Sequence, residues 1–529
     1  MNKNLKSLII ISGGMDMKKV YQLLTALMLA FSANVYAEES SAFGETIASV
    51  SKMVDGFFSD YTGWFVSLVF KSVPVGGANF PVIVGWLLLA AAIFTVYFGF
   101  IQFRRAGMAI DIVSGKYTDP NAKDDGEVSH FQALTTALSG TVGLGNIAGV
   151  GAALAIGGPG ATFWMILCGL LGMASKFCEC TLGVKYRTIL PSGAVSGGPM
   201  YYLSTGMSEL GLAGFGKVLA VGFAIMCILG SFGGGNMFQA NQAHAMLTYA
   251  FEVPSEYGMI TGLVLAALVF SVIVGGMPSI ASVTEKVVPW MAVLYVSMAL
   301  IVIIANIGQV GAAFSAIFEG AFTGAGVAGG VIGALIQGLK RATFSNEAGI
   351  GSAAIAHSAV KTKEPVTEGL VSLLEPFIDT VVICTMTALV ITIAGLNAAP
   401  FPGEGLTGVQ LTAASFTATA GVFKYLLALA VILFAFSTMI SWSYYGLKAW
   451  TYLFGEGAQT ELIYKIIFCF FVVLGATIQF GAVIDFSDAA IFAMSIFNIA
   501  GLYFLMPVVK KELNSFIARV YSGEIKKFK

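Results

Sequence analysis

Two glycine-dense stretches decide the fold of this chain: Gly140-Thr-Val-Gly-Leu-Gly-Asn-Ile-Ala-Gly-Val-Gly151 and Thr343-Phe-Ser-Asn-Glu-Ala-Gly-Ile-Gly351. They share a six-residue pattern, because Asn146-Ile-Ala-Gly-Val-Gly in the first corresponds to Asn346-Glu-Ala-Gly-Ile-Gly in the second. A glycine inside a helix costs about 1 kcal/mol relative to alanine. We therefore predict that both stretches interrupt helices and that they belong to an internal repeat. No Lys-Ser or Lys-Thr pair follows the first set of glycines, which argues against a nucleotide-binding loop.

The composition is that of a membrane protein. Of the 529 residues, 57% are hydrophobic and only 11% are charged, whereas about 25% of the residues in an ordinary soluble domain are charged. The 28 basic and 29 acidic residues cannot cover a soluble core of this size. Because the net charge is −1, the chain also has no basic face for a nucleic acid. We predict an all-α protein that crosses the lipid bilayer many times.

Eleven apolar segments, preceded by an amphipathic stretch at 47–73, are long enough to span a bilayer. Their expected limits are 80–101, 131–156, 160–183, 217–248, 258–276, 287–305, 325–353, 367–394, 422–447, 462–480 and 485–508. The glycine-dense stretches lie in the second and the seventh span, so an odd offset gives the two halves opposite orientations. That pattern is typical of an inverted repeat whose broken helices form a site near the membrane midplane. Close helix packing on small residues is the simpler alternative for the glycines.

The chain divides into six parts. These are a signal-like leader (1–37), an amphipathic segment (38–79), an extra span (80–101), two five-helix repeats (131–305 and 325–508) and a basic tail (509–529). The leader has the basic start, short apolar run and small-residue cleavage site of a secretory signal, with an uncleaved anchor as the alternative. Lys and Arg gather at alternate junctions between spans, and the intervening junctions contain none. The positive-inside rule then places the N-terminus outside and the C-terminus in the cytoplasm.

Two further spans carry polar groups. The ninth places an aromatic and hydroxyl stripe on one helix face, at spacings of three and four: Phe434, Thr438, Ser441, Trp442 and Tyr445. The fourth contains Gly233-Gly-Gly-Asn-Met-Phe-Gln-Ala-Asn-Gln242. Hydroxyls that bond the carbonyl four residues back, and amides that join helices, are the simpler interpretations. The pair Ser437-Thr438 beside an indole favours the wall of an ion and substrate site.

Four of these motifs, in this order, resemble those of the alanine/glycine:cation symporter family, the bacterial sodium:alanine symporters. They are Gly140-Thr-Val-Gly-Leu-Gly-Asn-Ile-Ala-Gly, Gly235-Asn-Met-Phe-Gln-Ala-Asn, Arg341-Ala-Thr-Phe-Ser-Asn-Glu-Ala-Gly and Ser437-Thr-Met-Ile-Ser-Trp-Ser-Tyr-Tyr-Gly. The resemblance covers residues 80–510. It implies a LeuT-like fold of five plus five inverted helices, here with one extra N-terminal span, in the bacterial inner membrane.

The resemblance also implies roles for individual residues. The unwound first core helix would face the substrate carboxylate, Gln239 would reach the amino group, and Phe344 would cover the ligand. The substrate-binding residues implied in this way are Thr141, Gly143, Gly145, Asn146, Gln239, Phe344, Thr438 and Trp442. A sodium ion would bind the carbonyls of Ser139, Val142 and Phe434 and the hydroxyls of Ser437 and Thr438.

The function implied is the sodium-coupled import of a small neutral amino acid, alanine or glycine, by alternating access. Sodium would act as the coupling ion, and neither a cofactor nor a catalytic residue is expected. A proton-coupled or broader-range amino-acid carrier is the main alternative, and a channel is an alternative of a different class. A membrane enzyme would need a nucleophile or a metal cluster, but the three histidines (130, 244 and 357) are scattered in the sequence. The sequence does not indicate an oligomeric state.

Local spacing predicts partners for two groups of intramembrane charges. Glu347 lies beside the second break, and we expect it to pair with Lys340 or Arg341. In the third span, Lys176 and Glu179 are three positions apart and can pair on one helix face.

Overall fold

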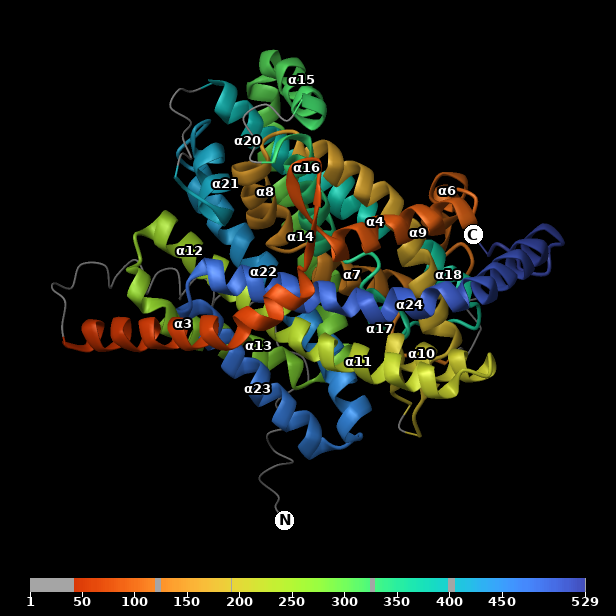
Figure 1. Ribbon diagram of the computed structural model, residues 1–529. Coiled ribbons are helices and arrows are strands. Elements are labelled where there is room, and N and C mark those ends of the chain that lie inside the picture. The colour runs from red at the N-terminus through yellow and green to blue at the C-terminus, as the bar shows by residue number, and fades with distance from the viewer. Residues whose placement is uncertain (1–41, 119–124, 192, 324–328, 398–404, 529) are drawn as a thin grey trace.

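The structure is a computed structural model that describes residues 42–118, 125–191, 193–323, 329–397 and 405–528. Within these ranges the chain is almost entirely helical (Figure 1). The predicted leader at 1–37 lies outside the described residues.

The N-terminal part consists of one long helix, a hairpin and three further helices. They are α3 (Ala42–Val69), β1 (Ser72–Val75), β2 (Ala78–Pro81), α4 (Val82–Tyr97), α5 (Ile101–Arg104) and α6 (Ala106–Val113). The α3 helix packs along the last helix of the chain, where the rings of Phe58 and Phe486 meet edge to face at 5.1 Å. The sequence analysis does not predict this hairpin. Its turn is Gly76-Gly77, where both residues have positive φ, the conformation of a tight two-residue turn.

The first predicted repeat contains two helices that are interrupted by π-helical turns. Its elements are α7 (His130–Thr141), η1 (Gly145–Gly149), α8 (Val150–Gly157), α9 (Ala161–Lys185), β3 (Thr188–Ile189), β4 (Val195–Ser196), α10 (Pro199–Glu209), α11 (Ala213–Phe232), η2 (Gly233–Met237), α12 (Phe238–Phe251), η3 (Ser255–Tyr257), α13 (Gly258–Ile273) and α14 (Gly276–Ala305). Both π-helical turns fall in glycine-dense stretches: η1 is Gly145-Asn-Ile-Ala-Gly149, and η2 begins with the three consecutive glycines 233–235.

The second predicted repeat follows α15 (Ile307–Thr323). Its elements are α16 (Gly330–Asn346), α17 (Ala353–His357), α18 (Pro365–Val371), α19 (Leu374–Pro376), η4 (Phe377–Cys384), α20 (Thr385–Asn397), α21 (Gly408–Thr417), α22 (Phe423–Phe454), α23 (Ala458–Thr477) and α24 (Phe480–Tyr521).

Eight helical segments in the described residues are long and apolar enough to cross a membrane. The pair His130–Thr141 and Gly145–Gly157, bent by 44°, makes a ninth if it is one span. The two other predicted spans coincide with shorter helices, α4 with 16 residues and α16 with 17. The protein is therefore a multi-pass membrane protein, and the count of eleven spans stays a prediction.

The α22 helix lies at the centre of the bundle, and most of its 32 residues are buried. It packs against α7, α11, α12 and α14, and Figure 1 shows it in the middle of the bundle. The first broken helix and the glycine-rich turn η2 therefore both contact α22.

Candidate functional site

The first broken helix opens directly after α7. This helix ends at Thr141, and Val142 leaves the helical conformation with a ψ of 82°. Oδ1 of Asn146 accepts a hydrogen bond from the Gly143 N–H at 2.9 Å and so holds the opened turn. A Cβ at position 143 would lie only 2.4 Å from Oγ1 of Thr438. Glycine is therefore required here because α22 approaches the backbone so closely.

The second broken helix opens in the same manner after α16. This helix ends at Asn346, and Glu347 takes the left-handed conformation with a φ of 59°. Gly349 and Gly351 also have positive φ, at 88° each. Oδ1 of Asn346 accepts a hydrogen bond from the Ala348 N–H at 2.9 Å. Each break thus contains an asparagine that satisfies a backbone donor released by unwinding.

The same two asparagines tie both breaks to one segment, the π-helical turn η4. Nδ2 of Asn146 donates to Oδ1 of Asp379 at 2.6 Å, and Nδ2 of Asn346 donates to Oγ1 of Thr380 at 2.9 Å. Ser345 adds a hydrogen bond from its hydroxyl to Oδ1 of Asp379 at 3.1 Å. The matching asparagines of the sequence repeat therefore have matching structural roles, on adjacent residues of η4.

The residues expected to bind sodium gather where α7 meets α22. The Thr438 hydroxyl donates to the Ser139 carbonyl at 2.9 Å, and the Ser139 hydroxyl donates to the Ser437 carbonyl at 2.6 Å. The Ser437 hydroxyl donates to the Phe434 carbonyl at 3.1 Å. All four residues are buried. The structure thus brings several carbonyl and hydroxyl oxygens together, which are the ligand types that a hard cation such as sodium prefers.

Two expected residues flank this cluster at the end of α7. Val142 is the residue after the helix, and its N–H bonds the Leu138 carbonyl at 2.6 Å. The Thr141 hydroxyl bonds the Ala137 carbonyl at 3.2 Å, one turn back along its own helix. The Thr141 hydroxyl therefore bonds within α7.

Gln239 lies between the two glycine-rich turns of the first repeat. Its Oε1 accepts a hydrogen bond from the Leu144 N–H at 3.1 Å, and its Nε2 donates to the Gly234 carbonyl at 2.8 Å. The amide expected at the substrate amino group therefore makes two bonds within the protein, which hold the first break against η2.

The two expected aromatic residues lie beside neighbouring glycines of η2. The ring centroids of Phe344 and Phe238 are 4.9 Å apart. A Cβ added at Gly234 would lie 3.3 Å from Cε2 of Phe344. A Cβ at Gly235 would lie 2.3 Å from the indole of Trp442. Gly145 of the first break also lies beside the Phe344 ring, because a Cβ added at position 145 would be 3.4 Å from Cδ1 of Phe344. Both rings are thus close to the first break and to η2.

The predicted partners of Glu347 are wrong. Its carboxylate accepts a hydrogen bond from the Ser352 hydroxyl and one from Nε1 of Trp442, the latter at 2.9 Å. Lys340 and Arg341 both pair instead with Asp488 of α24. Tertiary packing explains the difference, because α24 brings the buried Asp488 to the two cations, while Ser352 and the Trp442 indole donate hydrogen bonds to the equally buried Glu347.

The predicted pair of Lys176 and Glu179 is also replaced by tertiary partners. Nζ of Lys176 lies 3.1 Å from Oε2 of Glu375, and both groups are fully buried. Glu179 accepts a hydrogen bond from Nδ2 of Asn498 at 2.8 Å.

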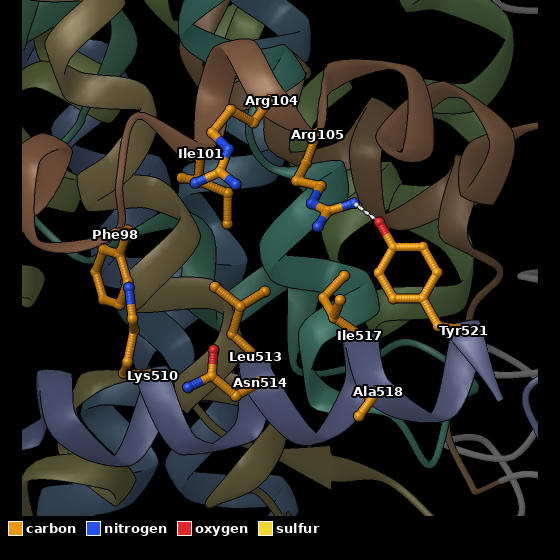
Figure 2. A pocket seen from close by; sticks show the side chains of 10 residues that line it. All are labelled: Phe98, Ile101, Arg104, Arg105, Lys510, Leu513, Asn514, Ile517, Ala518 and Tyr521. Carbon is orange, nitrogen blue, oxygen red and sulfur yellow. Dashed lines mark hydrogen bonds between the residues drawn. The ribbon is translucent and has the colours of Figure 1, made fainter.

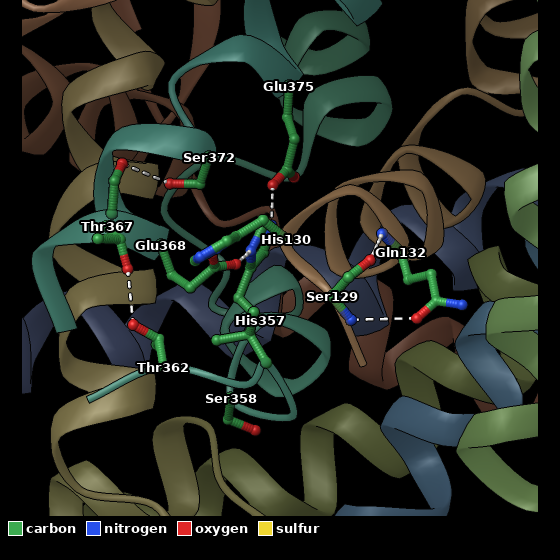
Figure 3. Close-up of polar contacts among 12 residues, drawn as sticks. Ser129, His130, Gln132, His357, Ser358, Thr362, Thr367, Glu368, Ser372 and Glu375 are labelled. Atoms are coloured by element: carbon green, nitrogen blue, oxygen red, sulfur yellow. Dashed lines mark hydrogen bonds and ion pairs between the residues drawn. The ribbon is translucent and has the colours of Figure 1, made fainter. Parts of the chain in front are cut away.

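Two of the three histidines, which are scattered in the sequence, meet at one carboxylate (Figure 3). Nδ1 of His130 and Nδ1 of His357 bond the two oxygens of Glu368, the latter at 2.5 Å. Nε2 of His357 lies 2.5 Å from Oε1 of Glu375. A buried network therefore runs from the first turn of α7 through α17 and α18 to Lys176 of α9.

A metal ion is a second interpretation of part of this network. Cys180, His357 and Glu375 place possible ligand atoms within 4.8 Å of one another. Both ring nitrogens of His357, however, already bond carboxylates, and Glu375 also pairs with Lys176. The arrangement is satisfied by hydrogen bonds and charges of the chain itself. It therefore fits a structural link better than a metal centre.

Comparison with known sequences gives consistent matches. A model of the sodium:alanine symporter family matches residues 65–529. The sodium/alanine symporter AgcS of Methanococcus maripaludis is 44% identical over 437 residues, which are 81% of this chain and 93% of that protein. The probable sodium/glutamine symporter GlnT of Bacillus subtilis is 32% identical over 83% of this chain and 89% of that protein.

Comparison with solved structures supports the predicted fold. The structure of MhsT in complex with L-phenylalanine superposes with a TM-score of 0.51, over 74% of this chain and 99% of that one. The sequence identity is 14%, so the similarity concerns the fold. The described helices therefore follow a LeuT-like arrangement.

Proposed function

This chain belongs to the sodium:alanine symporter family, and from that premise we propose that it imports alanine or glycine together with sodium by alternating access. The proposal includes a location in the inner membrane with the C-terminus in the cytoplasm, in line with the positions of Lys and Arg.

The observation that carries this proposal is the contact between the end of α7, where the first break begins, and the hydroxyl pair Ser437-Thr438 of α22. The oxygens of Ser139, Phe434, Ser437 and Thr438 lie together and include no carboxylate. A zwitterionic substrate suits the adjacent break, because the ends of the half-helices offer partial charges of both signs. Sodium can therefore bind beside a neutral amino acid without a carboxylate ligand, while the nearby carboxylates of Asp379 and Glu347 bond Asn146 and Trp442.

Burial of the site supports alternating access. Asn146 and Ser139 are fully buried, and Thr438 and Trp442 are 1% exposed. Because a ligand cannot reach such residues without movement of the surrounding helices, loading and release each require a different arrangement of the bundle.

Uptake of labelled alanine into proteoliposomes tests the proposal directly. We expect saturable uptake when sodium is outside, and little uptake with lithium or potassium. Uptake driven by a proton gradient without sodium would favour the proton-coupled alternative. A sustained current without fixed coupling to alanine would favour a channel.

Substitution of Gln239 tests the link between the break and η2. Gln239→Ala removes two buried hydrogen bonds, each worth about 0.5–1.5 kcal/mol. We expect the alanine dissociation constant, measured in detergent, to rise about tenfold.

Gln242 provides the matched control, because it is also buried in α12 and its amide also makes two hydrogen bonds, to Asn241 and to the Val409 N–H. Gln242→Ala should leave the alanine affinity near the wild-type value. If the two substitutions change the alanine dissociation constant equally, Gln239 is not part of the binding site.

Substitution of Trp442 tests the size of the substrate pocket. Trp442→Ala removes a large ring beside η2 and the hydrogen bond to Glu347. We expect weaker alanine uptake together with new uptake of leucine or methionine. Trp442→Phe keeps a ring but loses the hydrogen bond, so it should continue to exclude the larger substrates. Normal alanine uptake by Trp442→Ala, with no larger substrate gained, would show that the indole only packs in the bundle.

A further inference from the structure

A cavity lies between the N-terminal helices and the end of α24, and none of the candidate transport-site residues lines it (Figure 2). Its volume is about 360 Å³. The 42 residues of α24 extend about 63 Å at 1.5 Å per residue, which is about twice the thickness of the hydrocarbon core of a bilayer. The last turns of α24, which line this cavity, therefore lie at the membrane surface that the predicted orientation assigns to the cytoplasm.

Three cations line the cavity: Arg104, Arg105 and Lys510. Arg104 is exposed, and the other two are half-buried. Nζ of Lys510 donates to the Tyr97 carbonyl at 2.9 Å, and Nη1 of Arg105 donates to the Tyr521 hydroxyl at 3.3 Å. Across the described ranges, none of the three forms an ion pair, and no acidic residue lines the cavity. Positive charge is therefore concentrated here without a counter-charge from the protein.

In the described part of the chain, three acidic groups pair with cations that do not line the cavity. Glu512 pairs with Lys185 at 2.8 Å, and Glu364 pairs with Arg519 at 2.5 Å. Asp111 pairs with Lys116 and Lys527, which hold the pKa of its carboxyl below the usual value. These carboxylates are therefore unavailable to the cavity.

The C-terminal tail does not fill the cavity in the described residues. The pair of Lys527 with Asp111 fixes the tail beside α6. A backbone hydrogen bond from the Phe528 N–H to the Lys116 carbonyl at 2.8 Å does the same. Among the described residues, the tail therefore leaves the cations of the cavity accessible to a ligand.

The cavity is apolar on its inner side and beside its opening. Phe98, Ile101 and Leu513 line it and are buried. Next to them, Phe100 directly before α5 and Phe103 within it are 49% and 62% exposed. Apolar side chains at a membrane surface, adjacent to unpaired arginines, fit a molecule that has both a negatively charged group and acyl chains.

We propose that this cavity binds the headgroup of an anionic phospholipid. The guanidinium groups of Arg104 and Arg105 contact the phosphate oxygens, for which their planar array of donors is suited. Lys510 adds positive charge on the opposite side, and the acyl chains lie along Phe100 and Phe103. The site connects α5 to α24, so a bound lipid fastens the extra N-terminal helices to the core.

Lipid titration of the full chain in detergent, followed by native mass spectrometry, tests this site. The probes are phosphatidylglycerol and phosphatidylcholine with identical acyl chains. We expect wild type to bind phosphatidylglycerol more tightly than phosphatidylcholine. The double substitution Arg104→Gln and Arg105→Gln should weaken phosphatidylglycerol binding on the order of tenfold, while phosphatidylcholine binding stays the same. Lys511→Gln, which removes a neighbouring exposed cation that does not line the cavity, should bind both lipids as wild type does.

A second variant fills the cavity without removing a charge. Asn514 lines it and is exposed on α24, so Asn514→Trp should reduce phosphatidylglycerol binding in a chain whose thermal midpoint is otherwise unchanged. Equal binding of the two lipids by wild type would overturn the proposal, as would unchanged phosphatidylglycerol binding by both variants. Displacement of phosphatidylglycerol by inorganic phosphate would identify a soluble phosphate as the ligand and would equally overturn it.

Discussion

We expect Gly143→Ala to impair sodium-coupled alanine uptake strongly. The added Cβ would lie 2.4 Å from Oγ1 of Thr438, whose hydroxyl bonds the Ser139 carbonyl at 2.9 Å. Either the opened turn or α22 must therefore shift, and overpacking of this kind costs about 1–3 kcal/mol. Both the sodium and the alanine affinity should fall by about 5- to 150-fold, as measured by binding to the purified protein.

Gly149→Ala is the matched control within the same broken segment. A Cβ at this position meets only Cδ of Arg341, at an ordinary contact distance of 3.7 Å. The control should bind sodium and alanine nearly as wild type does. If Gly143→Ala binds as well as Gly149→Ala, the close approach of α22 to the first break is not part of the site.

The second large effect concerns stability rather than transport. Glu368→Ala removes the carboxylate that accepts bonds from both His130 and His357, and it leaves two buried ring nitrogens without this partner. Loss of a buried charged partner of this kind costs about 3–5 kcal/mol. We expect a large fall in the thermal unfolding midpoint, measured in one detergent at fixed pH.

Glu364→Ala serves as the control for this substitution. Glu364 directly precedes α18, the short helix that carries Glu368. Its ion pair with Arg519 is solvent-accessible, with side-chain exposures of 28% for Glu364 and 30% for Arg519. Such pairs contribute about 0–1 kcal/mol, so the midpoint should change little. Similar midpoints for the two variants would contradict the structural role of the His130–Glu368–His357 link.

The sequence predicts the breaks in the bundle because their cause is local. Dense glycine and a repeated asparagine identify Asn146 and Asn346, and both side chains cap the opened turns of their own segments. Ser139 and Thr438, which hydrogen-bond in the structure, lie in two distant motifs that only the family resemblance joins, and their role at a sodium site stays a prediction.

The partners of the buried charges cannot be predicted from local spacing in the sequence. Lys176 could pair with Glu179 on one helix face, but in the interior it pairs with Glu375 of another helix. His130 and Glu368 are likewise brought together only by the fold, 238 positions apart in the chain. A buried charge is strongly stabilised by whichever opposite charge the tertiary structure supplies, so its partner cannot be read from neighbouring positions.

Hydropathy predicts where apolar segments lie but does not show where a helix inside such a segment breaks. The seventh predicted span, 325–353, contains the second break, so its continuous helix α16 has only 17 residues. Apolar composition extends across the break, whereas helical geometry does not, because Glu347 and two of the glycines that follow adopt positive φ.

The central claim is that sodium and substrate share a site between the first break and the hydroxyl pair of α22. Alanine binding across a sodium titration tests it most directly, with wild type, Ser437→Ala and Thr438→Ala compared in the same detergent. Sodium should raise the alanine affinity of wild type, because two ligands that favour one state are reciprocally linked. Ser437→Ala should shift the sodium midpoint upward but bind alanine almost normally at saturating sodium, whereas Thr438→Ala should weaken both. Alanine binding by wild type that does not depend on sodium, or an unchanged sodium midpoint in Ser437→Ala, would contradict the claim.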